Sequence, residues 1–163
     1  MAIMLPPELA HFLQMIGFEW PEGNEDKAFE YGGAWLEFAG QLSAAASASG
    51  QASGEIAQTN QGIGIDAFKK QMDDAEGPTI TARDMAMGVN VGGGICYLIA
   101  GAIIALKIVV IIQLVQFAIT VTEAIAAAVP TAGASMSLIP IAKIAAQKAI
   151  EFALNMAVEK LLG

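Results

Sequence analysis

The sequence of 163 residues is poor in the side chains that most often bind metal ions or act as nucleophiles. It contains one cysteine, Cys96, and one histidine, His11. A single cysteine excludes an intramolecular disulfide and a cysteine-rich metal site, and because Cys96 lies in an apolar run we interpret it as a small buried hydrophobe. A lone histidine lacks the further ligands or the orienting carboxylate that metal binding or nucleophile activation needs. We therefore predict no metal site and no catalytic residue of either type.

Charged residues are also scarce. They make up 15% of the chain, whereas about a quarter of the residues are charged in an ordinary soluble domain. The formal net charge of −8 comes from 16 acidic residues against 8 basic ones. Such a chain repels a phosphate backbone, and it offers no basic face that could release counterions. We predict that nucleic acid is not a partner.

Other signatures of enzyme chemistry are missing. The glycines from Gly88 to Gly94 do not form the Gly-x-Gly-x-x-Gly pattern that cradles phosphate after a strand. The acidic pairs Glu25-Asp26 and Asp73-Asp74 fall at predicted helix ends, where capping and solvation explain them. We predict a non-enzymatic protein with no cofactor and no small-molecule substrate.

The N-terminus does not have the form of a cleavable secretion signal. Such a signal has a basic leader, an apolar stretch and a small-residue cleavage site. Here Met1–Leu5 is followed at once by Pro6, Pro7 and Glu8. We expect that any export uses a route other than the Sec pathway.

Hydrophobic residues are abundant and unevenly distributed. They form 55% of the chain, and the mean hydropathy is +0.56. The first 87 residues carry 13 acidic and 4 basic side chains, whereas the last 76 carry 3 and 4. We predict one domain over residues 1–163, with an acidic half at 1–77 and an apolar half at 78–163. The apolar excess indicates a large core, a self-association surface, a partner interface or contact with lipid.

The acidic half has the pattern of a helical hairpin. Pro6 and Pro7 can open a short helix that ends at Gly17, and Asn24 can cap a second helix. A 4 and 3 spacing predicts a seam along this second helix that packs lengthwise on a partner helix; its members are Tyr31, Trp35, Phe38, Leu42 and Ala45. After a break at residues 59–64, the stretch 66–75 predicts a helix that runs the other way.

The apolar half begins with a long helix. Residues 81–84 resemble a capping box at its start. The stretch from Ile95 to Ile119 exceeds the roughly 20 residues that cross a bilayer core. Lys107 lies near the middle of that stretch, where an unpaired charge costs at least about 2.5 to 3.5 kcal/mol. Length alone favours a membrane span, and Lys107 argues against one.

Polar residues on the long helix indicate how it is placed. Lys107, Gln113 or Gln116, and Glu123 have spacings that fit one polar stripe. Such a stripe is typical of a central bundle helix that touches solvent, or of one side of a pore. We favour the bundle helix and keep membrane insertion as the alternative.

A final amphipathic helix follows a loop at residues 130–135, with Pro140 in its first turn. An i, i+4 polar stripe predicts that only a narrow edge of this helix faces water; its members are Lys143, Gln147, Glu151, Asn155 and Glu159. The predicted fold is thus all-α, with four to five helices: a helical hairpin packed on a long apolar helix and a C-terminal amphipathic helix. Trp20 and Trp35 are candidates for partner contacts or for core packing.

One segment resembles a known family. The run Phe18–Asp26, with Trp20-Pro21-Glu22 at its centre and Ala34-Trp35 after it, resembles the N-terminal helical domain of actinobacterial polymorphic toxins. This Trp-x-Gly-like class includes the channel domain of a mycobacterial necrotising toxin. Gly62 and Phe68 are similar to the turn and the second helix of Trp-x-Gly hairpins. The resemblance covers most of the chain. Together with the seam of the second helix, it makes six residues candidates for partner docking or core packing: Trp20, Tyr31, Trp35, Phe38, Gly62 and Phe68.

The resemblance has two departures. Asn60-Gln61-Gly62 stands where the family has Trp-x-Gly, so the tryptophan is missing. A Tyr-x-x-x-Asp or Tyr-x-x-x-Glu export signal is also missing, because Trp35 and Gly101 stand four residues after Tyr31 and Tyr97.

Membership of this class implies a targeting or docking module for type VII export of a toxin or effector. The implied partner is a helical protein or a second copy of the chain, and the implied location is secreted or cell-envelope associated. A membrane-inserting channel or pore is the alternative.

Overall fold

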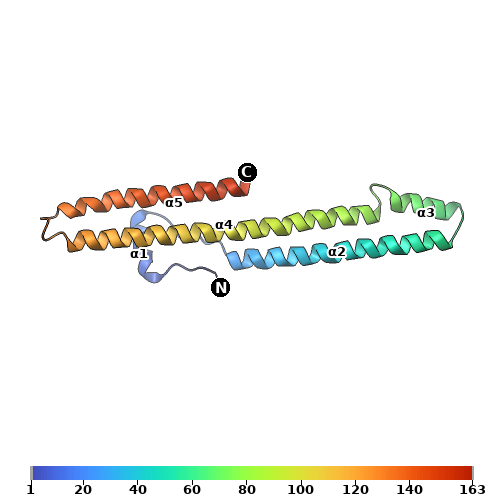
Figure 1. Cartoon of the computed structure of the whole chain (residues 1–163), viewed down its shortest axis with the longest axis horizontal. Coiled ribbons are helices and arrows are strands. Elements are labelled where there is room, and N and C mark those ends of the chain that lie inside the picture. Colours follow the sequence, from blue (N-terminus) through green and yellow to red (C-terminus); the bar gives the residue numbers. More distant parts are fainter. Residues whose placement is uncertain (1, 163) are drawn as a thin grey trace. The chain divides into compact units, whose positions relative to one another are not determined.

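The structure describes residues 2–162, and most of them are in helices, with no strand among them (Figure 1). The structure is a computed structural model. Its elements, in chain order, are α1 (Pro7–Ile16), α2 (Glu25–Thr59), α3 (Ile63–Asp73), α4 (Pro78–Ala126), the 3-10 turn η1 (Ala134–Ser137) and α5 (Leu138–Leu162). The predicted all-α class is confirmed.

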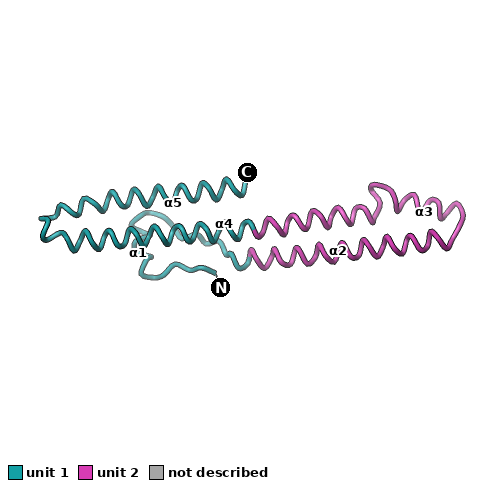
Figure 2. Tube along the Cα trace, in the orientation of Figure 1, with its two compact units in different colours: residues 1–27, 98–163 teal, residues 28–97 magenta. Residues whose placement is uncertain are grey.

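The helices are divided between two compact units (Figure 2). Unit 1 comprises residues 1–27 and 98–163, and unit 2 comprises residues 28–97. Unit 1 therefore holds α1, the second part of α4, and α5. Unit 2 holds most of α2, all of α3 and the first part of α4.

Most helix ends follow the local chemistry of the sequence. Pro7 opens α1, and Gly17 closes it in the left-handed conformation with φ of 85°, which glycine adopts without strain. The side chain of Asn24 accepts a hydrogen bond from the backbone N–H of Lys27 at 3.0 Å, as predicted for the start of α2. The predicted capping box at residues 81–84 is wrong, because Pro78 already opens α4. Thr81 instead donates its hydroxyl proton to the carbonyl of Glu76 at 3.3 Å.

The core of unit 1 forms where α1 crosses α4 and α5 (Figure 1). Leu13 and Ile16 of α1, three residues apart on one face of the helix, are buried. The rings of Phe12 and Phe117 meet edge to face with centroids 6.1 Å apart. The buried cluster consists of Leu13, Ile16, Val110, Leu114, Phe117, Val121, Ala146 and Ile150.

The orientation of α5 corrects the predicted amphipathic arrangement. Its buried residues are Ala146 and Ile150. Gln147, a member of the expected solvent-facing stripe, is half-buried and donates its side-chain N–H to the carbonyl of Ile16 at 2.7 Å. Large apolar side chains such as Phe152, 66% exposed, lie outside. The expected narrow solvent-facing edge is wrong, because only the face of α5 that carries Ala146 and Ile150 is buried in unit 1.

The hairpin of unit 2 is built on small residues. The buried positions of α2 in this unit are Gly32, Ala39 and Ala46, each seven residues after the last, as in a coiled-coil seam. The buried positions of α4 there are Thr79, Ala86 and Gly93, with the same spacing. A Cβ added at Gly93 would lie 3.1 Å from the carbonyl oxygen of Gly32 and 2.9 Å from Leu36. The two helices therefore approach closely because the seam lacks bulk.

This seam corrects two expectations. The aromatic face of α2 is not the buried face, since Tyr31, Trp35 and Phe38 are 58%, 47% and 50% exposed. The return helix predicted over residues 66–75 corresponds to α3. All residues of α3 are described by the structure, and none of them is buried. Most of the packing on α2 in unit 2 comes from the first part of α4, because its glycines and alanines fit the small residues of α2.

Candidate partner-docking surfaces

The aromatic side chains of α2 form an exposed face on unit 2. Tyr31, Trp35 and Phe38 are separated by four and three residues, so they lie on one side of the helix. We call these three residues the α2 aromatic face. The edge of the Trp35 ring would be 3.3 Å from a Cβ added at Gly92 of α4. A glycine in α4 therefore gives the indole ring room to rest against the neighbouring helix while about half of it stays exposed.

Other aromatic residues of unit 2 are placed differently. Phe29 pairs with Tyr97, with ring centroids 5.5 Å apart. Phe68 is half-buried on α3, and Gly62 is exposed in the turn before it, with φ of 120°. Among the predicted site residues, the structure thus brings Tyr31, Trp35 and Phe38 together on one helix face. It places Gly62 and Phe68 at the end of the hairpin where α2 gives way to α3.

Trp20 belongs to unit 1. Its half-buried ring packs against the core cluster of that unit, and the ammonium of Lys107 lies 5.8 Å from the ring centroid. This distance suits a cation–π contact. The role of Trp20 in the structure is therefore packing, while its outer edge stays accessible.

Lys107 is part of a buried ion pair, which corrects the predicted polar stripe. Its side chain is 3% exposed, and its ammonium lies 2.8 Å from a carboxylate oxygen of Glu25, which is 4% exposed. The other carboxylate oxygen of Glu25 accepts the backbone N–H of Ile3. The stripe is wrong because Lys107 turns inward to its counter-ion, and neither water nor a pore surrounds it.

The environment of Glu25 favours its charged form. The backbone N–H of Ile3 makes the largest contribution, followed by the hydrogen bond from Lys107, and together they lower the pKa of Glu25 from 4.5 to about 2. Both contacts stabilise the carboxylate over the neutral acid. Sequence reasoning missed this pair because its members are 82 residues apart.

The outer side of α4 in unit 1 is apolar and exposed. Leu98, Ile108, Ile112, Val115 and Ile119 are 40% to 66% exposed. Gly101 and Ala105 are exposed between them. The seven residues follow one another at alternating spacings of three and four, so they form one helix face. We call this set the α4 outer stripe: Leu98, Gly101, Ala105, Ile108, Ile112, Val115 and Ile119.

The same region of α4 is part of a candidate membrane span. In the part of the chain that the structure describes, one helical stretch, Ile63–Ala126, has length and composition sufficient to cross a membrane. The most apolar 18-residue window in it is only 17% buried. The chain by itself therefore leaves most of this apolar surface uncovered.

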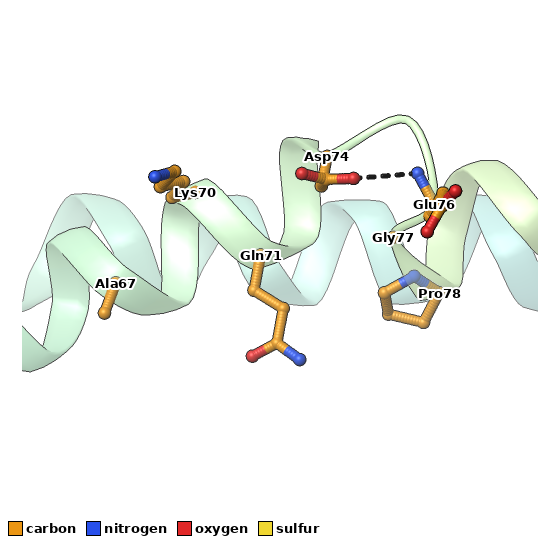
Figure 3. A pocket seen from close by; sticks show the side chains of 7 residues that line it. All are labelled: Ala67, Lys70, Gln71, Asp74, Glu76, Gly77 and Pro78. Atoms are coloured by element: carbon orange, nitrogen blue, oxygen red, sulfur yellow. Dashed lines mark hydrogen bonds between the residues drawn. The ribbon is translucent and has the colours of Figure 1, made fainter.

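The turn between α3 and α4 surrounds a hollow of about 420 Å³ on unit 2 (Figure 3). Asp74 accepts the backbone N–H of Glu76 at 2.9 Å across this turn. The side chains of Lys70 and Gln71 point to opposite sides of the ribbon in Figure 3, so they do not converge on a ligand. Within residues 2–162, no group of three or more His, Cys, Asp and Glu side chains is placed to hold a metal ion.

Comparison with protein families identifies the family of this chain. A family model described as a WXG100 like domain matches residues 5–148. The chain belongs to the WXG100-like family. No curated protein and no solved structure matches the chain. The similarity to polymorphic toxins and to a mycobacterial toxin stays a prediction.

Family membership gives the coarse outline of the function. WXG100-like proteins are non-catalytic, secreted helical proteins associated with type VII secretion, and they self-associate or pair with helical partners. In this WXG100-like protein, the turn that follows α2 contains Asn60, Gln61 and Gly62. Gly62 keeps its positive φ there, so the turn forms with Asn60 in the place of a tryptophan.

Proposed function

We propose that this protein is a non-enzymatic targeting and docking module for type VII export of a toxin or effector. In this proposal a helical protein partner binds to the α2 aromatic face of unit 2. The protein is secreted or associated with the cell envelope. It binds neither nucleic acid nor a small-molecule substrate.

The main observation in support of this proposal is that Tyr31, Trp35 and Phe38 are exposed. Tryptophan and tyrosine are enriched among the residues that dominate binding energy at protein interfaces. Here they stand in one row on a helix that is held against α4 by small residues. A rigid row of large rings can fill the gaps between side chains of a partner helix with little loss of conformational entropy.

Co-expression with a small helical-hairpin protein encoded nearby tests the proposal. We expect a stable complex with the unchanged chain, and a complex at least about tenfold weaker after Trp35→Ala, the size of effect expected for a residue of this kind. Phe152→Ala is the matched control, because Phe152 is an exposed aromatic residue on α5 of unit 1. Equal weakening by both substitutions, or unchanged binding after Trp35→Ala, argues against the α2 aromatic face.

Export of the chain gives a second readout. We expect that Trp35→Ala reduces secretion through a type VII system while the cellular amount of the protein stays the same. Phe152→Ala leaves secretion unchanged. Full secretion of the Trp35→Ala protein counts against a docking role in export.

Membrane insertion is a second candidate function, and the exposed α4 outer stripe favours it. The stripe spans 22 residues from Leu98 to Ile119, about 33 Å of helix at 1.5 Å per residue, which is close to the thickness of a bilayer core. Glu25 neutralises Lys107, the charge that argues most strongly against insertion. A rise in ion conductance across a planar bilayer after addition of the purified chain supports this candidate. An unchanged conductance argues against a pore.

A further inference from the structure

Residues 2–5 of unit 1 precede α1 and lie outside the helices. Ile3 and Leu5 are half-buried, and Leu5 packs against the core cluster of unit 1. Met4, which stands between them, is 73% exposed. Burial of alternate side chains is the pattern of an extended chain that lies on a surface. We call residues 2–5 the strap.

The strap is joined to the buried ion pair through Glu25. The backbone N–H of Ile3 donates to one carboxylate oxygen of Glu25, and the ammonium of Lys107 donates to the other. Because both oxygens belong to one carboxylate group, the strap covers an oxygen that Lys107 leaves open. The same ammonium lies 5.8 Å from the ring centroid of Trp20. With the strap in place, the side chains of Lys107 and Glu25 are 3% and 4% exposed.

We propose that the strap is a releasable cover, and that its opening exposes the Lys107–Glu25 pair to water while α1, α4 and α5 keep their packing. The closed strap keeps the pair dry, and the dry pair holds the start of α2 on the middle of α4. This device lies within unit 1 and needs no partner. It therefore goes beyond the targeting and docking function and does not rest on it.

The strap has few contacts in comparison with α1. Among the described residues, the N–H of Ile3 makes the one hydrogen bond that joins the strap to the rest of unit 1. The apolar side chains of the strap are half-buried, whereas Leu13 and Ile16 of α1 are 5% and 0% exposed. Segments with few buried contacts open at a lower free energy than the core. The strap can therefore open before the core does.

Opening of the strap changes the electrostatics of the pair. Water takes the place of the Ile3 N–H on the carboxylate of Glu25 and reaches the neighbouring ammonium of Lys107. Water reduces the attraction between two charges, and ion pairs in contact with water contribute little to stability. The open state therefore weakens the contact between the start of α2 and α4.

Chemical labelling of Lys107 in the folded full chain is the first test. The N-hydroxysuccinimide ester of acetic acid acetylates lysines that solvent reaches, and mass spectrometry reports each site. Ile3→Pro removes the N–H that binds Glu25. We expect Lys107 to be acetylated at least about tenfold faster in this variant, the effect of losing one hydrogen bond to a charged group. Lys69 is exposed on α3 and provides the reference rate.

Met4→Pro is the matched control. It places a proline one position later, where the side chain is exposed and the N–H makes no hydrogen bond among the described residues. This variant should leave the acetylation rate of Lys107 unchanged. Circular dichroism checks that both variants keep their helices. If Ile3→Pro leaves Lys107 as resistant as before, or if both substitutions accelerate its acetylation equally, the proposal is wrong.

Hydrogen exchange tests the same device without a substitution. We expect the rate at which the Ile3 amide exchanges to be independent of urea at low concentrations, because opening of the strap exposes little new surface. The amide of Leu114, a residue of the buried core, should exchange faster as urea is added, because its exchange requires a larger unfolding. The same urea dependence at both amides would mean that the strap opens only when unit 1 unfolds, and would overturn the proposal.

Discussion

Lys107 and Glu25 form a buried ion pair in unit 1, with 2.8 Å between the ammonium nitrogen and a carboxylate oxygen. The pair joins the start of α2 to the middle of α4, and the backbone N–H of Ile3 completes the hydrogen bonding of the carboxylate. A buried charge without its counter-ion is strongly destabilising. The pair therefore allows a lysine to lie within the most apolar helix of the protein.

Breaking this pair from one side should lower stability. We expect that Glu25→Gln and Lys107→Met each lower the thermal denaturation midpoint, because each leaves the other group buried without an opposite charge. The double variant should lose less than the two single losses combined, since neither charge then remains. Glu22→Gln, at an exposed site in the loop before α2, is the control and should have no effect. Additive losses in the double variant contradict a direct interaction.

The lowered pKa of Glu25 predicts a specific acid sensitivity. The pKa is about 2 in the folded protein against an ordinary value of 4.5, so the unfolded chain binds this proton more readily. The stability that Glu25 contributes is therefore complete above about pH 4.5 and is lost as the pH falls toward about 2. Urea midpoints measured between pH 2 and pH 6 check this. The difference between the unchanged chain and Glu25→Gln should shrink on acidification, and a constant difference would falsify the assignment.

Because α2 and α4 approach closely in unit 2, replacing two neighbouring glycines of α4 by alanine should change the stability in opposite directions. Gly93→Ala should destabilise the protein by about 1 to 2 kcal/mol, because the new methyl group meets Leu36 and the backbone of Gly32. Gly94→Ala should stabilise it by about 0.5 to 1 kcal/mol, because a Cβ added at this helical glycine would meet no atom of another helix within 4 Å among the described residues. Urea denaturation measures both. Equal effects at the two positions would contradict the packing of α2 on α4.

Thr79 offers a substitution that removes a polar atom from the seam. Its side chain is 7% exposed, and within residues 2–162 its hydroxyl has no hydrogen-bond partner. Valine has nearly the same shape and no hydroxyl group. Thr79→Val should therefore raise the free energy of unfolding by up to about 1 kcal/mol or leave it unchanged. A loss of more than about 1 kcal/mol would show that the hydroxyl makes a contact in solution.

The sequence predicts the helix ends of this protein better than its helix contacts. Pro7, Gly17 and Asn24 act on the backbone within one turn, so their effects can be read from neighbouring residues. The capping prediction at residues 81–84 failed because Pro78 opens the helix first. Where two local signals could each start the same helix, as Pro78 and residues 81–84 could for α4, the helix begins at the earlier one.

The aromatic row of α2 shows why the contacts were harder to predict. Its spacing fits a buried seam, but the buried positions are Gly32, Ala39 and Ala46. Small residues add little to a hydrophobic pattern, yet they allow two helices to approach more closely than large ones do. Their strict seven-residue spacing was the available signal. A search for repeats of Gly and Ala, as well as large apolar residues, would have found it.

The partner of Lys107 could not be found from local patterns at all. Glu25 lies 82 residues earlier, and its position at the start of α2 suits a capping role as well as an ion pair. The exposure of the candidate site residues also depends on tertiary packing. Trp35 is an example, because one part of its ring rests against Gly92 of α4 while about half of the residue stays exposed.

Flotation of the purified full chain with lipid vesicles tests the central claim that protein, and not lipid, covers its apolar surfaces. The vesicles are layered in a density gradient with the chain alone and with its helical partner. We predict that the chain stays at the bottom of the gradient in both cases. Recovery of the chain in the floating vesicle fraction, with its helices intact, would contradict the account.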